Sequence, residues 1–377
     1  MGTKVSLLFA TVLFTASCGI HAVKPAIQKE RWNSANDPMK MLPRDYEFSL
    51  ANLPLEGEIE LKPWADTYWP SNRGGIAYRW QTGDEGHSFQ PVTPSGAASM
   101  SLADLAKLSP AEKFDIFVGD ENMSLFRNEQ DRTSPSDGAW FGICHGWAPA
   151  SIAFKEPHAI IVKSAAGIDV PFGSSDIKAL ISLHSADYGQ SQTKFLASRC
   201  NIDISRDPSA ADRPECKDTN AGAFHLVLTN LIGRKKEGFV ADVTRDLEVW
   251  NQPVSGYTSQ IIRETNGASR GAAPTTVKEV EVQTTMTYGR EISAQWESAG
   301  TSLSSKRYKY RLEIDANGNI VGGEWLTEDR PDFLWQESVP AFVPASGRSR
   351  RTIDWRYLEV LYKAAIEATE DVANPNG

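Results

Sequence analysis

The sequence predicts an α+β fold, with an N-terminal helical and loop region, a cysteine-bearing core and a C-terminal β-rich region. Two observations lead to this prediction. Helix signals concentrate between residues 101 and 185, and strand and hairpin signals dominate from residue 224 onward. Of the 377 residues, 41% are hydrophobic and 23% charged, which is typical of a globular protein with a sizeable core.

Residues 1–22 predict an export signal. Lys4 supplies a positive charge, and residues 5–16 form an apolar run that is too short to span a bilayer. The run leads into a loose lipoprotein box that ends at Cys18; the alternative, which we favour, is ordinary cleavage after Ala22. Either route places the mature protein outside the cytoplasm, whether secreted, periplasmic or on the outer cell surface, with membrane attachment only if Cys18 carries a lipid.

The formal net charge of −9 argues against nucleic acid or an anionic membrane surface as the main partner, because both require a basic face. This charge leaves room for cationic partners, such as the lysine side chains of other proteins. Beyond the export signal, the sequence has no run long and apolar enough to predict a transmembrane helix.

Residues 23–120 form the predicted N-terminal region. Residues 57–80 are rich in glycine, proline and aromatic residues, which indicates ordered loops and short strands. Ser101, with an acidic residue three positions later, predicts the start of one helix. Ser109, followed by Pro110, predicts the start of a second helix.

Four cysteines are present, and one of them is left without a disulfide partner. Cys18 belongs to the export signal. Cys200 and Cys216 bracket a polar loop that contains prolines, so a disulfide between them is the natural pairing in an oxidising compartment. Cys144 is then an unpaired thiol in an exported protein, and catalysis is the commonest reason for keeping one.

Cys144 lies in a segment, residues 140–150, in which small residues precede the cysteine and aromatic and apolar residues follow it. Proline is tolerated only in the first helical turn, so Pro149 predicts a helix that begins at Cys144 or just after it. A helix N-terminus favours the thiolate form of cysteine. This pattern is typical of a papain-like cysteine enzyme, and we predict such a core over residues 121–265. The Cys144 N–H is one expected oxyanion donor, and Gln130 is a distant candidate for the second.

Two apolar segments, residues 224–232 and 239–244, predict strands that form a hairpin. His225 begins the first strand, and the order cysteine, histidine, acid matches the papain-like arrangement, so His225 is the predicted general base. Asp246 lies opposite His225 if the turn is centred in the polar segment between the strands. A bulge or a different turn favours Asp242 instead, and both remain candidates for the acid.

Residues 275–377 form the predicted C-terminal region, which follows a small polar linker at residues 266–274. We expect three strands and a terminal amphipathic helix, at residues 278–288, 306–314, 320–326 and 353–368. Residues 315–319 predict a hairpin turn; part of a calcium loop is the weaker interpretation, because no glutamate follows at the required spacing. The rest of the sequence contains no metal-binding motif.

Residues 249–257 (VWNQPVSGY) resemble the short elicitor peptide of the transglutaminase-elicitor family, known from oomycete plant pathogens and from bacteria. Residues 250–254 match outright, whereas Ser255 replaces a basic residue and Tyr257 replaces a phenylalanine. Three further segments also resemble the family: residues 63–70, 109–113 and 142–150. The resemblance spans roughly residues 45–260.

The resemblance implies a secreted protein-glutamine γ-glutamyltransferase with a papain-like core, which joins protein glutamine and lysine side chains by isopeptide bonds. Cys144 would form a thioester with the glutamine side chain, and His225 would act as base when the lysine amine attacks. The chemistry requires no cofactor, and calcium is a candidate because the oomycete member depends on it. Trp147, Trp250 and Asn251 are expected to line the substrate groove.

Two other functions fit the same sequence features. A papain-like cysteine peptidase would form the same acyl-enzyme and resolve it with water instead of an amine. A non-catalytic adhesion or elicitor module would carry the family's sequence segments without a working site.

Overall fold

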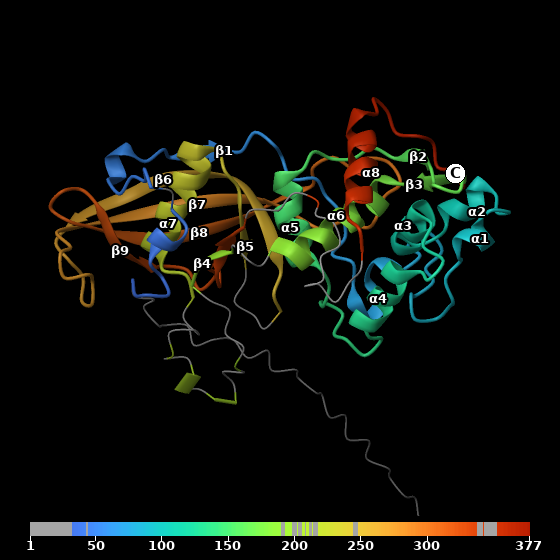
Figure 1. Ribbon diagram of the computed structural model, residues 1–377. Helices are drawn as coiled ribbons and strands as arrows, with labels where there is room; N and C mark the ends of the chain where they lie inside the picture. The colour runs from blue at the N-terminus through green and yellow to red at the C-terminus, as the bar shows by residue number, and fades with distance from the viewer. Residues whose placement is uncertain are drawn as a thin grey trace, which may run out of the picture.

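The computed structural model describes residues 32–42, 44–189, 193–197, 202, 206–207, 209–210, 213, 218–243, 248–337, 342 and 353–377. This part of the chain forms a long antiparallel sheet at one end and a group of helices at the other (Figure 1). The mixture of helices and sheet agrees with the predicted α+β class. The helix that begins at Cys144, α5, lies between the two ends (Figure 1).

The helices of the described chain are α1 (Pro94–Ala97), α2 (Leu102–Ala106), α3 (Pro110–Val118), α4 (Ser124–Arg132), α5 (Cys144–Ala153), α6 (Ser174–Tyr188), α7 (Ala221–Leu228) and α8 (Arg356–Glu367). Both predicted serine caps are confirmed: Ser101 accepts a hydrogen bond from the Asp104 N–H, and Ser109 closes a capping box with Glu112. The predicted C-terminal helix is also confirmed as α8. None of the described helices is long and apolar enough to cross a membrane.

The main sheet has eight strands, in the order β4-β10-β5-β6-β7-β8-β9, with β1 paired to β6 off this path. Its strands are β1 (Glu56–Glu58), β4 (Lys194–Leu196), β5 (Phe239–Asp242), β6 (Asn251–Asn266), β7 (Lys278–Gly289), β8 (Leu303–Ile314), β9 (Ile320–Trp325) and β10 (Leu334–Gln336). A separate hairpin joins β2 (Ile160–Lys163) to β3 (Asp169–Phe172). The three strands predicted in the C-terminal region are confirmed as β7, β8 and β9.

The segment predicted as a linker is a connection inside the sheet. β6 and β7 pair from Val254 with Tyr288 at one end to Asn266 with Lys278 at the other, so residues 267–277 close a long hairpin. The prediction of a linker is therefore wrong. Small polar residues suit a hairpin turn and an interdomain linker equally well, so composition does not distinguish the two.

The prediction of a strand at residues 224–232 is also wrong. Residues 221–228 form α7, and residues 229–235 continue it as a π-helical segment. Asn220 caps α7, since its side chain accepts hydrogen bonds from the N–H groups of Gly222 and Ala223. The segment is apolar on every side because it is buried on every side. A short apolar run of this kind fits a buried strand and a buried helix equally well.

The two faces of the sheet bury different hydrophobic clusters. Side chains alternate between faces along a strand, and in β5 Phe239 and Ala241 belong to the cluster that contains the α7 side chains. Val240 belongs to the other cluster, together with apolar residues of α5 and α6. Asp242 follows Val240 on this second face and lies opposite Asn251 in the strand register. The sheet therefore separates the side chains of α7 from those at the start of α5.

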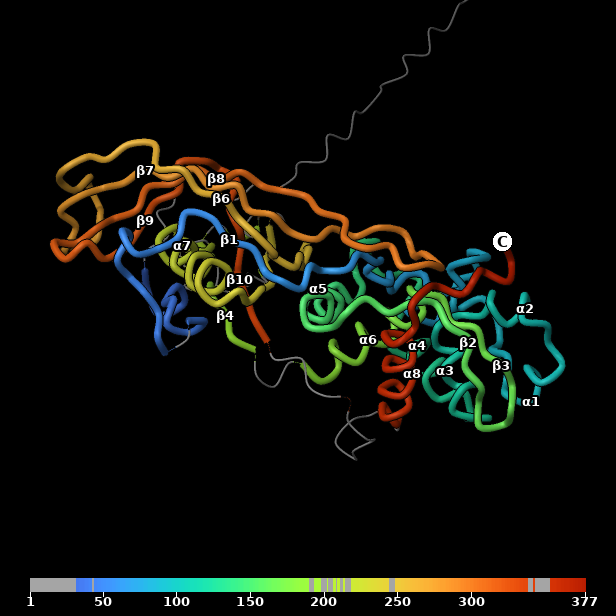
Figure 2. Tube along the Cα trace, turned by 90° about the horizontal axis from the view of Figure 1, so that it is seen from above, coloured from blue at the N-terminus to red at the C-terminus, as the bar shows by residue number. Residues whose placement is uncertain are grey.

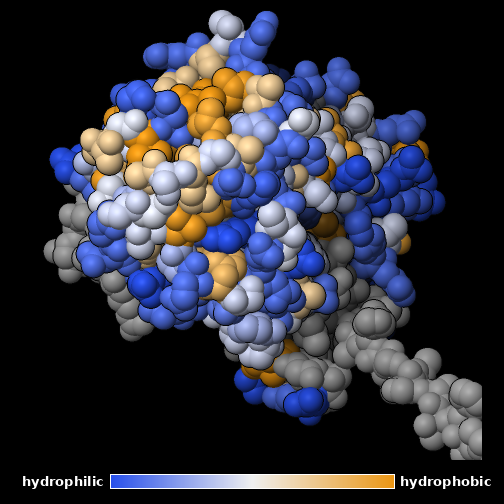
Figure 3. Space-filling model, turned by 90° about the vertical axis from the view of Figure 1, so that its right-hand side faces the viewer, coloured by the Kyte–Doolittle hydropathy of each residue, from blue (hydrophilic) through white to orange (hydrophobic). Residues whose placement is uncertain are grey.

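The helical end packs around α5 and α6. Figures 1 and 2 both place α5 beside α6, between the sheet and the helices α1 to α4 and α8, whereas α7 lies against the sheet. Seen face on, this end is mostly polar, with apolar residues gathered in the upper part of the view (Figure 3). The exposed large apolar side chains of the helical region include Tyr357 and Val360 of α8 and Ile161 of β2.

Candidate active site

Cys144 is the first residue of α5, as predicted, and its side chain is only 6% exposed. Pro149 lies inside this helix instead of in its first turn, so the proline rule used to place the helix start does not hold here. Two hydrogen bonds join Tyr68 to the loop before the helix. The Ile143 N–H donates to the Tyr68 carbonyl at 2.8 Å, and Tyr68 Oη donates to the Ala139 carbonyl at 2.6 Å. These bonds fix the loop that ends at the cysteine.

Glycines on both sides of Cys144 permit close backbone approach. A Cβ on Gly146 would lie 2.0 Å from the carbonyl oxygen of Ser182 in α6, and a Cβ on Gly142 would lie 2.4 Å from the carbonyl oxygen of Tyr68. No side chain fits at either distance. The small residues around the cysteine therefore bring α5 against α6 and the preceding loop against Tyr68.

Two groups from the β5–β6 connection and β6 make polar contacts with the sulfur. Asn251 Nδ2 donates to Cys144 Sγ at 3.4 Å, and Sγ lies 3.8 Å from the Val249 carbonyl, to which the thiol donates. Trp335 Nε1 donates to Asn251 Oδ1 at 2.7 Å. Because its oxygen is held by Trp335, the Asn251 amide presents its N–H group to the sulfur.

The surroundings of Cys144 in this structure favour the protonated thiol over the thiolate. Burial raises the pKa of Cys144 above its ordinary value, and the hydrogen bonds to Asn251 lower it. The nearby carboxylates of Glu291 and Asp242 raise this pKa further. Activation of the sulfur therefore depends on the Asn251 donor and on the positive end of the α5 dipole.

A pocket of about 590 Å³ opens over the sulfur. Its lining residues are Trp140, Phe141, Gly142, Cys144, His145, Ser185, Ala186, Thr193, Phe195, Val249, Asn251, Phe333, Trp335 and Glu337. One wall is aromatic, with Trp140 stacked on Phe141 at 4.1 Å between ring centroids. A second wall is formed by Phe195 and Trp335, which stack at 6.0 Å. A long, mainly apolar side chain with one polar end fits such a pocket.

His225 lies on the other side of the sheet, so its predicted role beside Cys144 is wrong. The residue belongs to α7, is 1% exposed, and its Nδ1 lies 2.7 Å from Tyr310 Oη within the cluster on the α7 face. Burial lowers the pKa of His225 to about 4. Among the described residues, the imidazole that lines the Cys144 pocket is that of His145, whose pKa burial also lowers to about 4.

Replacing His225 by asparagine is expected to leave the activity of the Cys144 site within about twofold of wild type, because the imidazole is remote from the sulfur. The melting temperature should fall, since one buried hydrogen bond is altered, at a cost of about 1 kcal/mol. Steady-state kinetics and thermal unfolding of the same preparation measure the two effects. A well-folded H225N protein that has lost its activity would contradict this placement.

Of the two residues predicted as the catalytic acid, the structure describes Asp242 but not Asp246. Asp242 is buried on the Cys144 face of the sheet, directly across from Asn251 in the register of β5 and β6. Its position favours an electrostatic influence on the sulfur, not the orientation of His225. Asp246 lies outside the described residues and stays a prediction.

The residues predicted to line the substrate groove lie in different places, and Asn251 is the one that contacts the sulfur, as described above. Trp147 is fully buried in the core, so the groove position predicted for it is wrong. Trp250 packs edge-to-face on Tyr68, with ring centroids 5.2 Å apart, and so supports the loop that leads to Cys144. Gln130 is turned toward the Gly86 carbonyl, to which it donates at 2.6 Å, and is not available as an oxyanion donor.

Other predicted features fall outside the described residues: the export signal with Cys18, and the disulfide between Cys200 and Cys216. They stay predictions. Cys144 is a free cysteine in the described part of the chain. The N–H group of Cys144, the first residue of α5, has no acceptor four residues earlier in the helix, as is general for a first helical residue, which keeps it as the expected oxyanion donor.

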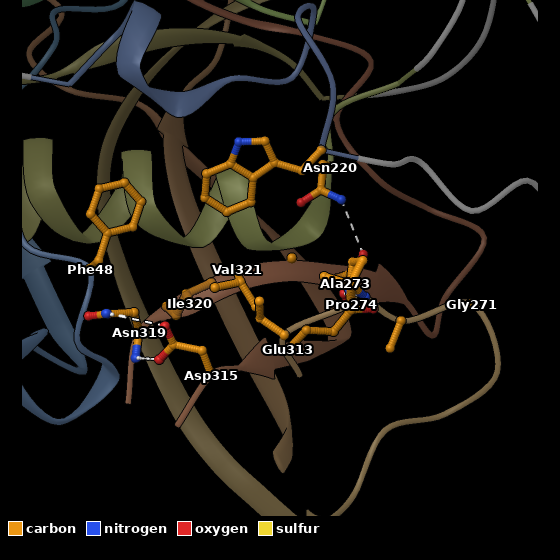
Figure 4. Close-up of a pocket in the computed structure, with 15 residues that line it drawn as sticks. Phe48, Asn220, Gly271, Ala273, Pro274, Glu313, Asp315, Asn319, Ile320 and Val321 are labelled. Atoms are coloured by element: carbon orange, nitrogen blue, oxygen red, sulfur yellow. Dashed lines mark hydrogen bonds between the residues drawn. The ribbon is translucent and has the colours of Figure 1, made fainter. Parts of the chain in front are cut away.

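A second pocket, of about 790 Å³, lies at the far end of the sheet, beside the turn over residues 315–319 (Figure 4). Both oxygens of the Asp315 carboxylate accept hydrogen bonds within that turn, from the Asn317 N–H and from the N–H and side chain of Asn319. The turn is therefore a closed hairpin loop, as predicted. The described residues contain no group of three or more histidine, cysteine or acidic side chains that could hold a metal ion.

Fold and site together define a class: a protein of helices and antiparallel sheet in which a buried cysteine at a helix N-terminus accepts a hydrogen bond from a side-chain amide beside an apolar pocket. The family model described as transglutaminase elicitor matches residues 120–360, more than half of the chain, and the chain belongs to that family. The match extends past residue 260, so it is longer at its C-terminal side than the predicted span of residues 45–260. It begins at residue 120 and does not include the segments at residues 63–70 and 109–113. It includes β7, β8, β9 and β10.

The structure is also similar to the crystal structure of the GP42 transglutaminase from Phytophthora sojae. The TM-score is 0.66 at 23% sequence identity, and the likeness covers 89% of this chain and 99% of the other. At this identity the likeness concerns the fold. Comparison with curated protein sequences gives no match.

Proposed function

We propose that this protein is a protein-glutamine γ-glutamyltransferase that acts outside the cytoplasm and joins glutamine to lysine side chains through a thioester on Cys144. The observation that carries the proposal is the contact between the Asn251 amide and Cys144 Sγ at the mouth of an apolar pocket. Membership of the transglutaminase elicitor family supports the same chemistry. The core is proposed to be papain-like, because its nucleophile begins a helix that packs against an antiparallel sheet.

In the first half-reaction, Sγ attacks the side-chain amide carbon of a substrate glutamine. The sulfur–carbon bond forms, the carbon–nitrogen bond breaks, and the nitrogen leaves as ammonia with the thiol proton. Asn251 stabilises the sulfur while it carries negative charge, and the Cys144 N–H receives the oxyanion. Trp335 keeps the Asn251 donor aimed throughout the step.

In the second half-reaction, the amine of a lysine attacks the thioester carbon. The new carbon–nitrogen bond forms, the carbon–sulfur bond breaks, and Sγ recovers a proton from the attacking nitrogen. Phe195 and Phe141 bring apolar surface to the pocket, and the proposal requires that a substrate bound against them excludes water, which would otherwise hydrolyse the thioester. This exclusion separates the proposed transferase from a peptidase on the same core.

The test is the incorporation of a fluorescent primary amine into a glutamine-bearing protein by wild type and by Cys144→Ala. We expect labelling by the wild type and its complete loss in C144A, because the thioester cannot form. Ammonia release should match the amount of label, one for one. Ser136→Ala, a change in the loop before the cysteine segment, serves as the matched control and should keep full activity.

The alternatives give different results in the same assay. Cleavage of the substrate backbone without labelling would point to a peptidase. A folded wild-type protein that releases no ammonia and forms no acyl-enzyme with a glutamine peptide would point to a non-catalytic adhesion or elicitor module, and the proposal would be abandoned.

A further inference from the structure

The pocket over Cys144 contains a carboxylate that the steps described so far do not use. Glu337 directly follows β10. Its Oε1 accepts from Ser185 of α6 at 3.4 Å, and its Oε2 accepts from Thr193, the residue before β4, at 3.3 Å. Both partners line the pocket, as Glu337 itself does. Within the described chain, the carboxylate has two neutral hydroxyl partners and forms no ion pair. Burial raises the pKa of Glu337 to about 7, against the effect of the two hydroxyls.

A glycine makes room for this carboxylate. A Cβ on Gly189 would lie 2.0 Å from Glu337 Oε1 and 2.4 Å from Glu337 Cδ. The backbone of Gly189 has φ −67°, which every residue type adopts, so its conformation alone does not require glycine. The space that Gly189 leaves open is occupied by the Glu337 side chain. The absence of a side chain at Gly189 therefore leaves space for one carboxylate at the end of α6.

The surroundings of the carboxylate suit a cation on an apolar stem. Phe195 is 42% exposed and stacks on Trp335, so an aromatic surface borders the same pocket. Aromatic faces attract ammonium groups, and apolar walls accommodate the methylene chain that carries one. A half-buried carboxylate without an ion pair gains most from a ligand that brings a positive charge.

We propose that Glu337 receives the amino group of the acceptor substrate, and that Gly189 sets the position of its carboxylate. This inference rests on the proposed function, and it names the group that selects a cationic primary amine. The incoming ammonium donates to Glu337 and transfers one proton to it. The resulting free amine attacks the thioester, its nitrogen loses a second proton to Sγ as the carbon–sulfur bond breaks, and Glu337 returns its proton to solvent.

The test compares two nucleophiles with one glutamine donor peptide. Cadaverine is a cationic primary amine, and hydroxylamine is a small nucleophile that is neutral at pH 8 and needs no carboxylate partner. For Glu337→Gln we expect kcat/KM for cadaverine to fall at least about tenfold, the value of one hydrogen bond to a charged group, mainly through KM. Hydroxamate formation should stay within about twofold of wild type, which also shows that E337Q is folded.

Gly189→Ala provides an independent variant that keeps the acid but displaces it. We expect the same selective loss with cadaverine, because the new methyl group would overlap the position of Glu337 Oε1 and displace the carboxylate. Gly96→Ala is its matched control, since a Cβ there meets its nearest atom at 3.5 Å, an ordinary contact. Glu359→Gln, an exposed acid on α8, is the control for E337Q. Both controls should behave as wild type with both nucleophiles.

The outcomes separate this inference from the proposed function. Equal losses with cadaverine and hydroxylamine, or no loss with either, would overturn the role of Glu337 and leave the transferase intact. A wild-type protein that forms no hydroxamate with a glutamine donor would contradict the proposed transferase function, and with it the proposed role of Glu337 in binding the acceptor amine.

Discussion

Replacing Asn251 by alanine is expected to lower kcat/KM for acyl transfer by about 10- to 100-fold, the value of one hydrogen bond to a charged group. The Asn251 amide donates to Cys144 Sγ, and the pKa of this thiol is already raised by its burial. Without the donor, the thiolate loses its one side-chain hydrogen bond among the described residues. The reactive form of the enzyme becomes scarcer at every pH below the thiol pKa.

Asn251→Asp should have the larger effect, although aspartate has nearly the same shape. The aspartate oxygen can still accept from Trp335, but its second oxygen places a negative charge where the N–H donor was. This charge adds to that of Asp242, which already raises the pKa of Cys144. The thiol pKa should therefore rise in the order wild type, N251A, N251D, and activity should fall in the same order.

The pH dependence of alkylation by iodoacetamide measures the thiol pKa directly, apart from any substrate. Trp335→Phe is the informative control, because it keeps the aromatic wall and removes only the bond that aims Asn251. We expect W335F to lie between wild type and N251A in both alkylation and activity. An N251D protein whose alkylation profile coincides with that of wild type would show that the amide does not act on the sulfur.

The parts of this fold that the sequence predicts are those with local signals. The serines that cap α2 and α3 and the turn at residues 315–319 each involve atoms only a few residues apart. The start of α5 at Cys144 is predicted as well, even though Pro149 sits deeper in the helix than the prediction assumes. In each case the chemistry of neighbouring residues is enough to determine the conformation.

The site could not be predicted in full because its groups come together through pairing of distant strands. Trp335 and Glu337 reach the pocket because β10 inserts between β4 and β5, and no local pattern indicates that insertion. The sequence also predicts the wrong position for His225, for a related reason. Its apolar surroundings fit a strand, and the face of the sheet on which a histidine lies is a tertiary property. The cap formed by Asn220 was the one local signal for a helix there.

Replacing Lys113 by methionine is expected to destabilise the protein by about 3–5 kcal/mol, the cost of breaking a buried ion pair. Lys113 of α3 and Asp176 of α6 are both fully buried, and their charged groups lie 2.6 Å apart. Asp176 also accepts from Trp80 Nε1 and from the Gly173 N–H, so its carboxylate stays fixed when the lysine is removed. A buried charge is then left without its counterion.

Lys363→Met is the matched control, because Lys363 pairs with Glu359 on the exposed side of α8, with side-chain exposures of 64% and 43%. It should cost at most about 0.5 kcal/mol. The double variant K113M/D176N should recover part of the loss from K113M, since no uncompensated charge remains. Chemical denaturation of the three variants measures these differences, and equal losses from K113M and K363M would contradict the argument.

The variant Asp176→Asn alone should show a stability that depends on pH in one direction. Burial lowers the pKa of Lys113, and Asp176 is the first group that opposes this effect, so its removal lowers the pKa further. A lysine whose pKa is lower in the folded than in the unfolded state binds fewer protons when folded. The stability of D176N should therefore rise as pH increases from neutral toward the ordinary pKa of lysine, about 10.4. A flat profile over this window would show that water reaches Lys113 once the carboxylate is gone.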